Sequence, residues 1–592
     1  MSSVSGNLTK ADPAATERRR ARPGRRAWAA ATLLAAAVLM FCYLRVAGGT
    51  QANSDGAGLV LEARSVLHGN VLLHGWWATD VSFYTTELPE YVGVTAVAGL
   101  RPEVVHICSA LTYTLLVLLA AFVARGRARG AEGVVRALLA AGLILAPQPT
   151  GPTQVLLGSP DHVGTGVPVL LLLLLLDWAA GRPQGPRWYV PVGAGVLLSW
   201  AIIGDPLIEV VGVLPLFLAS AVRAARALWP DRRAAPRGLG PALSWVWSAA
   251  WYELSLAAAA VAAIGVKHLF DALLQSLGGI RTAHAWYHLL SRHEIIRGLP
   301  MTVRSVFALF GADYIGVKGA GNVAFACVHF IGVAVVLAAA LAAAWRLLRP
   351  RRAVGGPAEG GPADSGRGDL VTGVLVLALA ANLAAFVVDV PKPGVYSAHE
   401  IGPVLSLGAA LAGRVLGGPI LAGWTRTGGA RSRLGRALLP ALAAGLAGYA
   451  VMLGIAAAHP QVPPRNAGLS AWLVKHHLLR GLAPYWEASS ITVDSGGKVT
   501  MLTVAPGGRH GHLKPRQWQS DLRLPYTMGS ANFVIVSPAE DVHTSQVLNS
   551  FGSPARSYHY GTLTVMVWHR NLLPALSLPS GGPDQPATDP AG

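Results

Sequence analysis

Apolar segments of about twenty residues recur along most of the chain, and each is long enough to cross a bilayer as a helix. Hydrophobic residues occupy 52% of the 592 positions and charged residues 13%, whereas a soluble domain carries about 25% charged residues. The sequence therefore predicts a mainly α fold, a polytopic transmembrane helix bundle of about eleven spans, with a small extracytoplasmic α/β domain at its C-terminal end.

Arginines mark the expected topology. They cluster in every second segment between spans, as in 125–129 and 223–237, and the alternate segments contain few basic residues. Basic loops stay on the cytoplasmic side, so the pattern predicts a multi-pass protein of the cell membrane with a cytoplasmic N-terminus. Most of the net charge of +18 is then a topology signal. No nucleic-acid-binding motif accompanies this charge, so nucleic acid is not an expected partner.

The apolar and polar segments together predict the domain organisation. The expected parts are a basic disordered tail (1–26), a transmembrane domain (27–457) with outer loops at 49–106 and 267–320, an extracytoplasmic α/β domain (458–572), and a disordered tail (573–592). The three cysteines fall within apolar segments, so we interpret them as packed side chains rather than disulfides or metal ligands.

Shorter patterns predict elements outside the spans. Helical periodicity at 57–68, ending at Gly69, indicates an amphipathic helix on the membrane surface. In the C-terminal domain, 467–480 is expected to form a helix capped by Gly481. Further elements are a hairpin over 491–504, strands at 532–537 and 560–568, and a helix near 541–550.

The stretch His74–Tyr91 has the strongest claim to chemistry. It is too polar to span a membrane, and it carries Asp80 among four aromatic residues: Trp76, Trp77, Phe83 and Tyr84. Apolar surroundings raise the pKa of a carboxyl group and make it a better general base. Asp80 is therefore the expected catalytic residue. The alternative is that Asp80 only caps a short helix.

Glu87 and Glu90 follow in the same stretch. Glu87 is seven residues beyond Asp80 and would share a helical face with it. Pro89 indicates that this helix ends nearby, so Glu90 is not expected to lie on the same helical face as Asp80 and Glu87.

Other polar residues fall at the outer ends of spans in several loops. Ionisable groups at membrane depth are costly and face a polar interior, so we expect them to form one outward-facing cavity with Asp80. The expected substrate-binding residues are Glu87, Trp76, Trp77, Tyr84, Asp161, His162, Asp205, Arg292, Arg297, His399 and Glu400. The alternative is that loops are polar in any membrane protein.

Two ligand chemistries remain open for this cavity. His162, His293 and His399 could hold a divalent metal with a carboxylate, although the ligand spacing of known motifs is absent. No cofactor is therefore assigned. The second outer loop contains a group able to bind phosphate: Arg281, Arg292 and Arg297 with His284, His288 and His293. This group also fits a helix lying at lipid headgroups.

The architecture resembles that of the GT-C class of membrane glycosyltransferases. Two stretches, Gly69–Pro89 and Gly481–Ala488, are similar to actinobacterial membrane proteins of this kind, which use polyprenyl-phosphate-linked sugars. The resemblance implies that Asp80 takes the place of the first-loop catalytic aspartate. This chain departs from the common family pattern because no second acid adjoins Asp80.

The resemblance further implies an inverting glycosyl transfer on the outer face of the membrane. Asp80 would deprotonate an acceptor hydroxyl on an envelope glycan, lipid or protein, and a hexosyl or pentosyl group would leave polyprenyl phosphate. Arg292 or Arg297 would stabilise that phosphate. The rival hypotheses are a transporter or flippase of a lipid-linked or polar solute, and an inactive scaffold for envelope assembly.

Overall fold

The computed structural model describes twelve stretches of the chain. They are 25–147, 152–158, 161–182, 186–229, 238–283, 289–313, 315, 319–348, 364–389, 394–425, 430–507 and 511–578. Most of both expected tails falls outside them. Residues 573–578 are an exception to the expected disorder, because a short 3-10 turn at Leu573–Ala575 packs the buried Leu573 and Leu576 against the C-terminal core.

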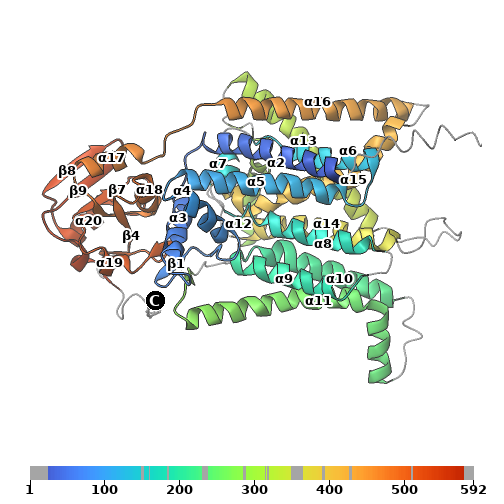
Figure 1. The fold of residues 1–592 in the computed structure, drawn as a ribbon, viewed down its shortest axis with the longest axis horizontal. Coiled ribbons are helices and arrows are strands. Elements are labelled where there is room, and N and C mark those ends of the chain that lie inside the picture. The colour runs from blue at the N-terminus through green and yellow to red at the C-terminus, as the bar shows by residue number, and fades with distance from the viewer. Residues whose placement is uncertain are drawn as a thin grey trace, which may run out of the picture.

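Long apolar helices run side by side and form one bundle (Figure 1), which confirms the predicted fold class. Its members are α2 (Arg25–Ala47), α5 (Glu103–Arg125), α6 (Gly130–Ile144), α8 (Gly166–Ala180), α9 (Tyr189–Gly204), the π-helical turn η1 (Glu209–Val213) leading into α10 (Leu214–Leu228), α11 (Leu239–Ser276), α13 (Ala320–Leu348), α14 (Asp364–Val388), α15 (Gly402–Thr425) and α16 (Ala430–Ala458). Among the described residues, eight helical segments are long and apolar enough to cross a membrane, and α8 and α9 are shorter apolar helices. The chain is a multi-pass membrane protein.

A cap of shorter elements covers one end of this bundle. It contains α3 (Ser54–Leu67), α4 (Glu87–Ala98), α7 (Pro152–Leu157), α12 (Arg292–Leu309) and the 3-10 helix η3 (Val395–Ile401). Helix α3 lies across the bundle end (Figure 1), starts at its cap Asn53, and packs between α4 and the C-terminal domain. The apolar side chains of α3 (Ala57, Leu59, Val60 and Ala63) are buried in a cluster with residues of the first loop, α4 and α5. They therefore do not face lipid, as a helix on the membrane surface would require.

The C-terminal domain is an α/β unit at the same end of the bundle (Figure 1). Its six-stranded sheet has the order β5 (Leu513–Pro515), β4 (Thr500–Pro506), β3 (Arg480–Ala483), β7 (Phe533–Val536), β9 (Leu563–Val567) and β8 (Arg556–Tyr560). Strands β4, β3 and β7 run parallel, and the other pairs are antiparallel. The helices are α17 (Ala467–Lys475), α18 (Tyr485–Asp494), α19 (Leu524–Thr527) and α20 (Thr544–Phe551). The small α/β domain is confirmed.

Two local predictions in this domain need correction. The expected hairpin over 491–504 is a helix followed by a strand, because α18 runs to Asp494. This helix is buried on nearly every side, so its sequence lacks an amphipathic pattern, and its β-branched residues favour a strand prediction. The expected helix over 467–480 ends at Lys475, and Gly481 lies in β3 instead of capping a helix. The expected strand at 560–568 is confirmed as β9 (Leu563–Val567), which forms a hairpin with β8.

A second sheet of three short strands joins distant parts of the chain. Strand β1 (Trp76–Ala78) from the first outer loop lies between β2 (Arg281–Thr282) from the second outer loop and β6 (Ser520–Asp521) from the C-terminal domain. Trp77 pairs with Arg281 in parallel, and Trp76 pairs with Asp521 in antiparallel register. This sheet therefore fixes the residues that follow β1 relative to both partners.

Close packing of Gly58 against Gln519 makes this docking testable. A Cβ at Gly58 would lie 2.3 Å from the Gln519 side chain, which is buried and hydrogen-bonded to the carbonyl of Asp55. We expect Gly58→Ala to lower the free energy of unfolding by about 1–3 kcal/mol through overpacking. Gly93→Ala in α4 is the matched control, because a Cβ there meets nothing within 4 Å. Thermal unfolding in detergent measures both, and equal midpoints would contradict the proposed contact.

Candidate active site

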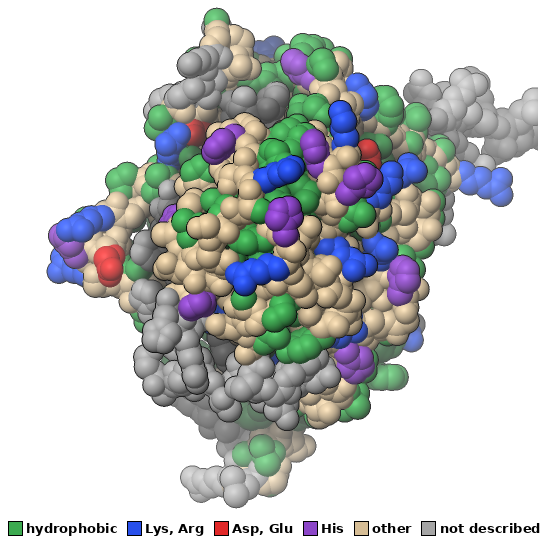
Figure 2. All heavy atoms as spheres, turned by 90° about the vertical axis from the view of Figure 1, so that its left-hand side faces the viewer, with side chains coloured by type: hydrophobic (Ala, Val, Ile, Leu, Met, Phe, Trp, Pro, Cys, Tyr) green, Lys and Arg blue, Asp and Glu red, His purple; other side chains and the backbone are tan. Residues whose placement is uncertain are grey.

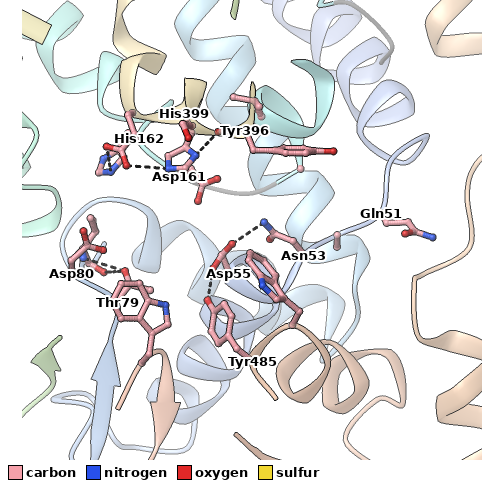
Figure 3. A pocket seen from close by; sticks show the side chains of 18 of the residues that line it. Gln51, Asn53, Asp55, Thr79, Asp80, Asp161, His162, Tyr396, His399 and Tyr485 are labelled. Carbon is pink, nitrogen blue, oxygen red and sulfur yellow. Dashed lines mark hydrogen bonds and ion pairs between the residues drawn. The ribbon is translucent and has the colours of Figure 1, made fainter. Parts of the chain in front are cut away.

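A cavity of about 840 Å³ lies where the cap meets the C-terminal domain. Four segments of the cap and four of the C-terminal domain contribute to it. The lining residues are Gln51, Ala52, Asn53, Asp55, Thr79, Asp80, Val81, Phe83, Val155, Gly158, Asp161, His162, Tyr396, Ser397, His399, Glu400, Arg465, Tyr485, Trp486, Arg516, Trp518, Ala539 and Glu540. Figure 3 shows Asp161, His162 and His399 on one side of it and Asp55 and Tyr485 facing one another on the other.

Asp80 lies in the loop directly after β1 and lines this cavity. Its side chain is partly exposed. Asp80 also lines a side cavity of about 50 Å³ between the first loop and α11, and the two cavities share no other described residue. The side cavity contains an ion pair between Lys267 and Asp271, whose atoms Nζ and Oδ2 are 2.8 Å apart. Asp80 therefore stands between two spaces that could each hold a ligand group.

A second first-loop acid, Asp55, lies in the first turn of α3. Its carboxylate accepts a hydrogen bond from Asn53 Nδ2 at 2.9 Å, and it contacts the Tyr485 hydroxyl. That hydroxyl is also 2.7 Å from Gln519 Oε1. Burial raises the pKa of Asp55 to about 7, with a further contribution from the charge of Asp161. A carboxyl group with this pKa can exchange protons near neutral pH.

His162 is held from behind by Asp205. The His162 Nδ1 atom is 3.0 Å from Asp205 Oδ2, and Asp205 accepts further hydrogen bonds from the Thr165 hydroxyl and from the Leu207 amide at 2.9 Å. Burial lowers the pKa of His162, but the Asp205 charge and hydrogen bond outweigh it and raise the pKa to about 10. The same pairing outweighs the effect of burial on Asp205 and lowers its pKa. His162 is therefore a cation at neutral pH.

The C-terminal domain supplies the aromatic and basic wall of the cavity. Arg516 lies 5.4 Å from the centre of the Tyr485 ring, and Trp486 and Trp518 line the same wall. The buried Glu487 pairs with Arg465. Burial, with a hydrogen bond to Glu487, raises the pKa of Glu540 to about 9. Glu540 is therefore protonated at neutral pH. Arg516 pairs with Asp541, whose Oδ2 is 3.0 Å from Arg516 Nη1, so each arginine of this wall has a carboxylate partner.

The structure brings together Asp80, Asp161, His162, His399 and Glu400 in this cavity, and it places Asp205 directly behind His162. It does not bring the predicted aromatic residues there. Trp76 is buried, and its Nε1 donates to Ser65 Oγ. Trp77 lies in the middle strand of the three-stranded sheet, and Tyr84 faces the side cavity. Trp76 and Trp77 point to the two faces of the three-stranded sheet, and neither lines the main cavity.

Glu87 lies in a separate small pocket with Tyr91, Ser109 and Thr112. It does not share a helical face with Asp80, because α4 begins at Glu87 and Asp80 precedes the helix. Pro89 stands in the first turn of α4, where its ring is tolerated, so it does not end the helix as expected. Burial raises the pKa of Glu87 to about 8.

Arg292 and Arg297 lie on α12, are exposed, and do not line the cavity. The cavity instead draws Arg465 and Arg516 from the C-terminal domain. His284 and His288 of the expected phosphate group lie outside the described residues. Within the described part of the chain, no group of three or more His, Cys, Asp or Glu side chains has the arrangement to hold a metal ion.

Sequence reasoning missed most residues of the cavity wall, among them Asp55, Arg465, Tyr485, Trp486, Arg516, Trp518 and Glu540. A signal existed for two of them, since Tyr485 and Trp486 belong to the Gly481–Ala488 stretch that carried the family resemblance. The Asn53-Ser-Asp55 run after the first span is a helix-start signal. Arg516 and Trp518 precede β6, and only the strand pairing brings them to the first loop.

Comparisons with known proteins give structural likeness without sequence matches. No family model matches the chain, and no curated protein matches it. ArnT from Cupriavidus metallidurans bound to undecaprenyl phosphate is similar over 92% of this chain and 98% of its own, with 12% identity and a TM-score of 0.49. The apo form of the Archaeoglobus fulgidus oligosaccharyltransferase is similar over 87% of this chain and 70% of its own, with 14% identity and a TM-score of 0.43.

The raised pKa of Asp55 has a consequence for stability. Its pKa is 3.8 ordinarily and about 7 when folded, so between these values the folded protein keeps a proton that the unfolded chain has released. Stability from this group is present below pH 4 and is lost as the pH rises through 7. Asp55→Asn removes the ionisable group, and with it this loss of stability at rising pH. We expect the variant to gain on the order of 1–2 kcal/mol relative to the parent between pH 5 and pH 8.

Thermal unfolding at the two pH values measures this difference. Asp271→Asn, which removes a carboxylate from the side cavity, is the control and should show no such pH-dependent gain. An Asp55→Asn effect of the same size at pH 5 and pH 8 would contradict the assignment.

Proposed function

We propose that the chain is a membrane glycosyltransferase of the GT-C type that transfers a sugar from a polyprenyl-phosphate-linked donor to an acceptor hydroxyl on the outer face of the membrane. The observation that carries the proposal is the convergence of two first-loop carboxylates, a histidine cation and a basic aromatic wall on one cavity. Both sequence stretches that resemble this class, Gly69–Pro89 and Gly481–Ala488, contribute residues to that cavity.

The chemistry follows from the roles of these groups. Asp80, as general base, accepts the proton of the acceptor hydroxyl, and the hydroxyl oxygen attacks the anomeric carbon of the sugar. The bond from that carbon to the phosphate oxygen breaks, and polyprenyl phosphate leaves with the electron pair. The attack inverts the anomeric centre. Asp80 is favoured as base because it borders both cavities and takes the place of the first-loop catalytic aspartate in the class that the sequence resembles.

The location of the cavity favours an enzyme over a transporter. Transporter sites lie near the bilayer midplane between broken helices. This cavity lies beyond the bundle end, between the cap and the C-terminal domain, where a lipid headgroup and a water-soluble or polymeric acceptor can meet. A scaffold without activity would not need the paired Asp205 and His162 aimed at that space.

The distribution of basic residues supports an extracytoplasmic cavity. Helices α5, α10 and α13 carry Arg125, Arg226 and Arg346 in their last turns, at the ends that the positive-inside rule assigns to the cytoplasm. The outer end of the C-terminal domain carries many Lys, Arg and His side chains and few carboxylates (Figure 2). A surface of this charge favours anionic envelope polymers as partners. We propose an envelope glycan, lipid or protein as acceptor and a hexosyl or pentosyl group as the sugar.

Substitution of the two acids tests the reaction. Full-length protein in detergent is given polyprenyl-phosphate sugars with candidate acceptors, and release of polyprenyl phosphate is measured. We expect Asp80→Asn to lower kcat by about 10²–10⁴-fold, the usual contribution of a general base. Asp55→Asn should reduce the rate less. The reverse order would move the base to Asp55, and an unchanged rate in both variants would exclude a first-loop base.

The topology has its own test. A reporter that is active only outside the cytoplasm, fused after residue 592, should be active, and the same reporter inserted at 355 should be inactive. These outcomes follow because an odd number of spans separates the two positions under the proposed arrangement. Activity at position 355 alone would invert the topology and place the cavity in the cytoplasm.

A further inference from the structure

Two histidine rings in the cavity present the same nitrogen to the same carboxylate. The His162 and His399 rings are stacked, with centres 5.9 Å apart and planes at 20°. His162 Nε2 is 3.8 Å from Glu400 Oε2, and His399 Nε2 is 3.4 Å from Glu400 Oε1. The Glu400 carboxylate therefore lies between two ring nitrogens that both point into the space of the cavity.

The other nitrogen of each ring is fixed by an acceptor. His162 Nδ1 faces only the Asp205 carboxylate, 3.0 Å away, and His399 Nδ1 faces the Tyr396 carbonyl at 2.7 Å. A nitrogen that faces an acceptor carries the proton. Each ring is therefore held with Nδ1–H turned to the protein, and its Nε2 can donate to an anion when the ring is protonated. In binding and catalytic histidines, the ring is commonly oriented in this way, by a hydrogen bond from the nitrogen that does not contact the ligand.

Glu400 is the loosest member of this group. Its side chain is 46% exposed, whereas those of His162 and Asp205 are 13% and 3% exposed. Both of its contacts to the rings are longer than a good charge-assisted hydrogen bond. A side chain with this exposure and these contacts can turn toward solvent at low cost, while the histidines remain in place. The anion between the rings is thus replaceable and its binding partners are not.

We propose that His162 and His399 form a binding site for a phosphate monoester, and that the Glu400 carboxylate occupies it until the ligand displaces it. This inference deepens the proposed function and rests on it for the identity of the ligand, which would be the polyprenyl phosphate released as the product. In the donor the same phosphate is a diester with one negative charge. In that role the two Nε2–H groups stabilise the charge that develops on the phosphate as the glycosidic bond breaks.

Charge and position both favour phosphate here. A phosphate monoester carries nearly two negative charges and three acceptor oxygens at neutral pH, so it competes with a single carboxylate for two donors. The raised pKa of His162 keeps that ring cationic across the neutral range. Arg465 and Arg516 line the same cavity, each paired with a carboxylate. The charged or titratable groups that face His162 are Asp205, Glu400, Asp80 and His399.

Asp205 is a positioning residue in this scheme. It contacts His162 and lies outside the cavity lining, where Thr165 and the Leu207 amide fix its carboxylate. Its charge outweighs the effect of burial on the ring. Loss of that charge lowers the pKa of His162 and leaves a neutral ring whose Nε2 no longer donates. The pH dependence of phosphate binding therefore depends on the contact between Asp205 and His162. If Asp205 had only a structural role, its substitution would not change that pH dependence.

Equilibrium binding to full-length protein in detergent tests the site without turnover. The ligands are a polyprenyl phosphate and, separately, inorganic phosphate, each titrated at several pH values. We expect Glu400→Gln to tighten polyprenyl phosphate binding by about tenfold, and His162→Gln to weaken it by about ten- to a hundredfold, the range of charge-assisted hydrogen bonds. His569→Gln, at an exposed histidine of the C-terminal domain, is the matched control and should change nothing.

The pH series adds a second measurement. In the parent protein, the affinity for polyprenyl phosphate should be constant from neutral pH to about pH 9. It should fall near pH 6, where the phosphate dianion takes up a proton. Asp205→Asn should bring the loss of affinity at rising pH into the neutral range. A tighter Glu400→Gln variant cannot result from misfolding, so this arm remains decisive if His162→Gln or Asp205→Asn folds poorly.

Three results would overturn the proposal. They are an unchanged or weaker affinity in Glu400→Gln, an unchanged affinity in His162→Gln, and an affinity for inorganic phosphate equal to that for polyprenyl phosphate, which would assign the site to free phosphate. Because the assay needs no acceptor and no turnover, its outcome is separate from that of the transfer reaction. Tight binding with no glycosyl transfer would support this site and contradict the proposed function.

Discussion

The docking of the C-terminal domain on the first outer loop is the interaction on which the candidate site depends. Strand β1 pairs on one edge with β6 of that domain and on the other with β2, and α3 packs against α18. The Tyr485 hydroxyl reaches across this junction to Asp55 and Gln519. Without the junction the cavity would lose the wall that holds its arginines and tryptophans, and Asp55 would face water.

The charges in the cavity are arranged by burial more than by pairing of opposite neighbours. Asp55 and Glu540 are pushed toward their neutral forms, because a desolvated carboxylate is unfavourable. His162 is held cationic against the same effect by the fully enclosed Asp205. Together these shifts lower the negative charge of the lining at neutral pH. A cavity rich in acids can therefore accept a phosphate-bearing ligand.

The sequence predicted the bundle well and the cap poorly, because the two depend on different kinds of interaction. A membrane span must be apolar over its whole length, so its signal is local. The identity of the cavity residues is a matter of contacts between segments. Arg292 and Arg297 were reasonable candidates by residue type, but α12 leaves them exposed, while Arg516 reaches the cavity from a segment more than 200 residues away. Helix α18 was read as a strand because burial on all sides removes the amphipathic pattern.

By itself the sequence determined the mainly α bundle, the α/β domain at its end, and the choice of Asp80, Asp161, His162, His399 and Glu400 as polar residues at the ends of spans. These features follow from the lengths of the apolar segments, which can be measured along consecutive residues. Only the tertiary structure decided that Asp205 stands behind His162, that Glu400 lies between two rings, and that Asp55 and Tyr485 meet. Such contacts join residues far apart in the chain, so they follow from packing and strand pairing that no local pattern encodes.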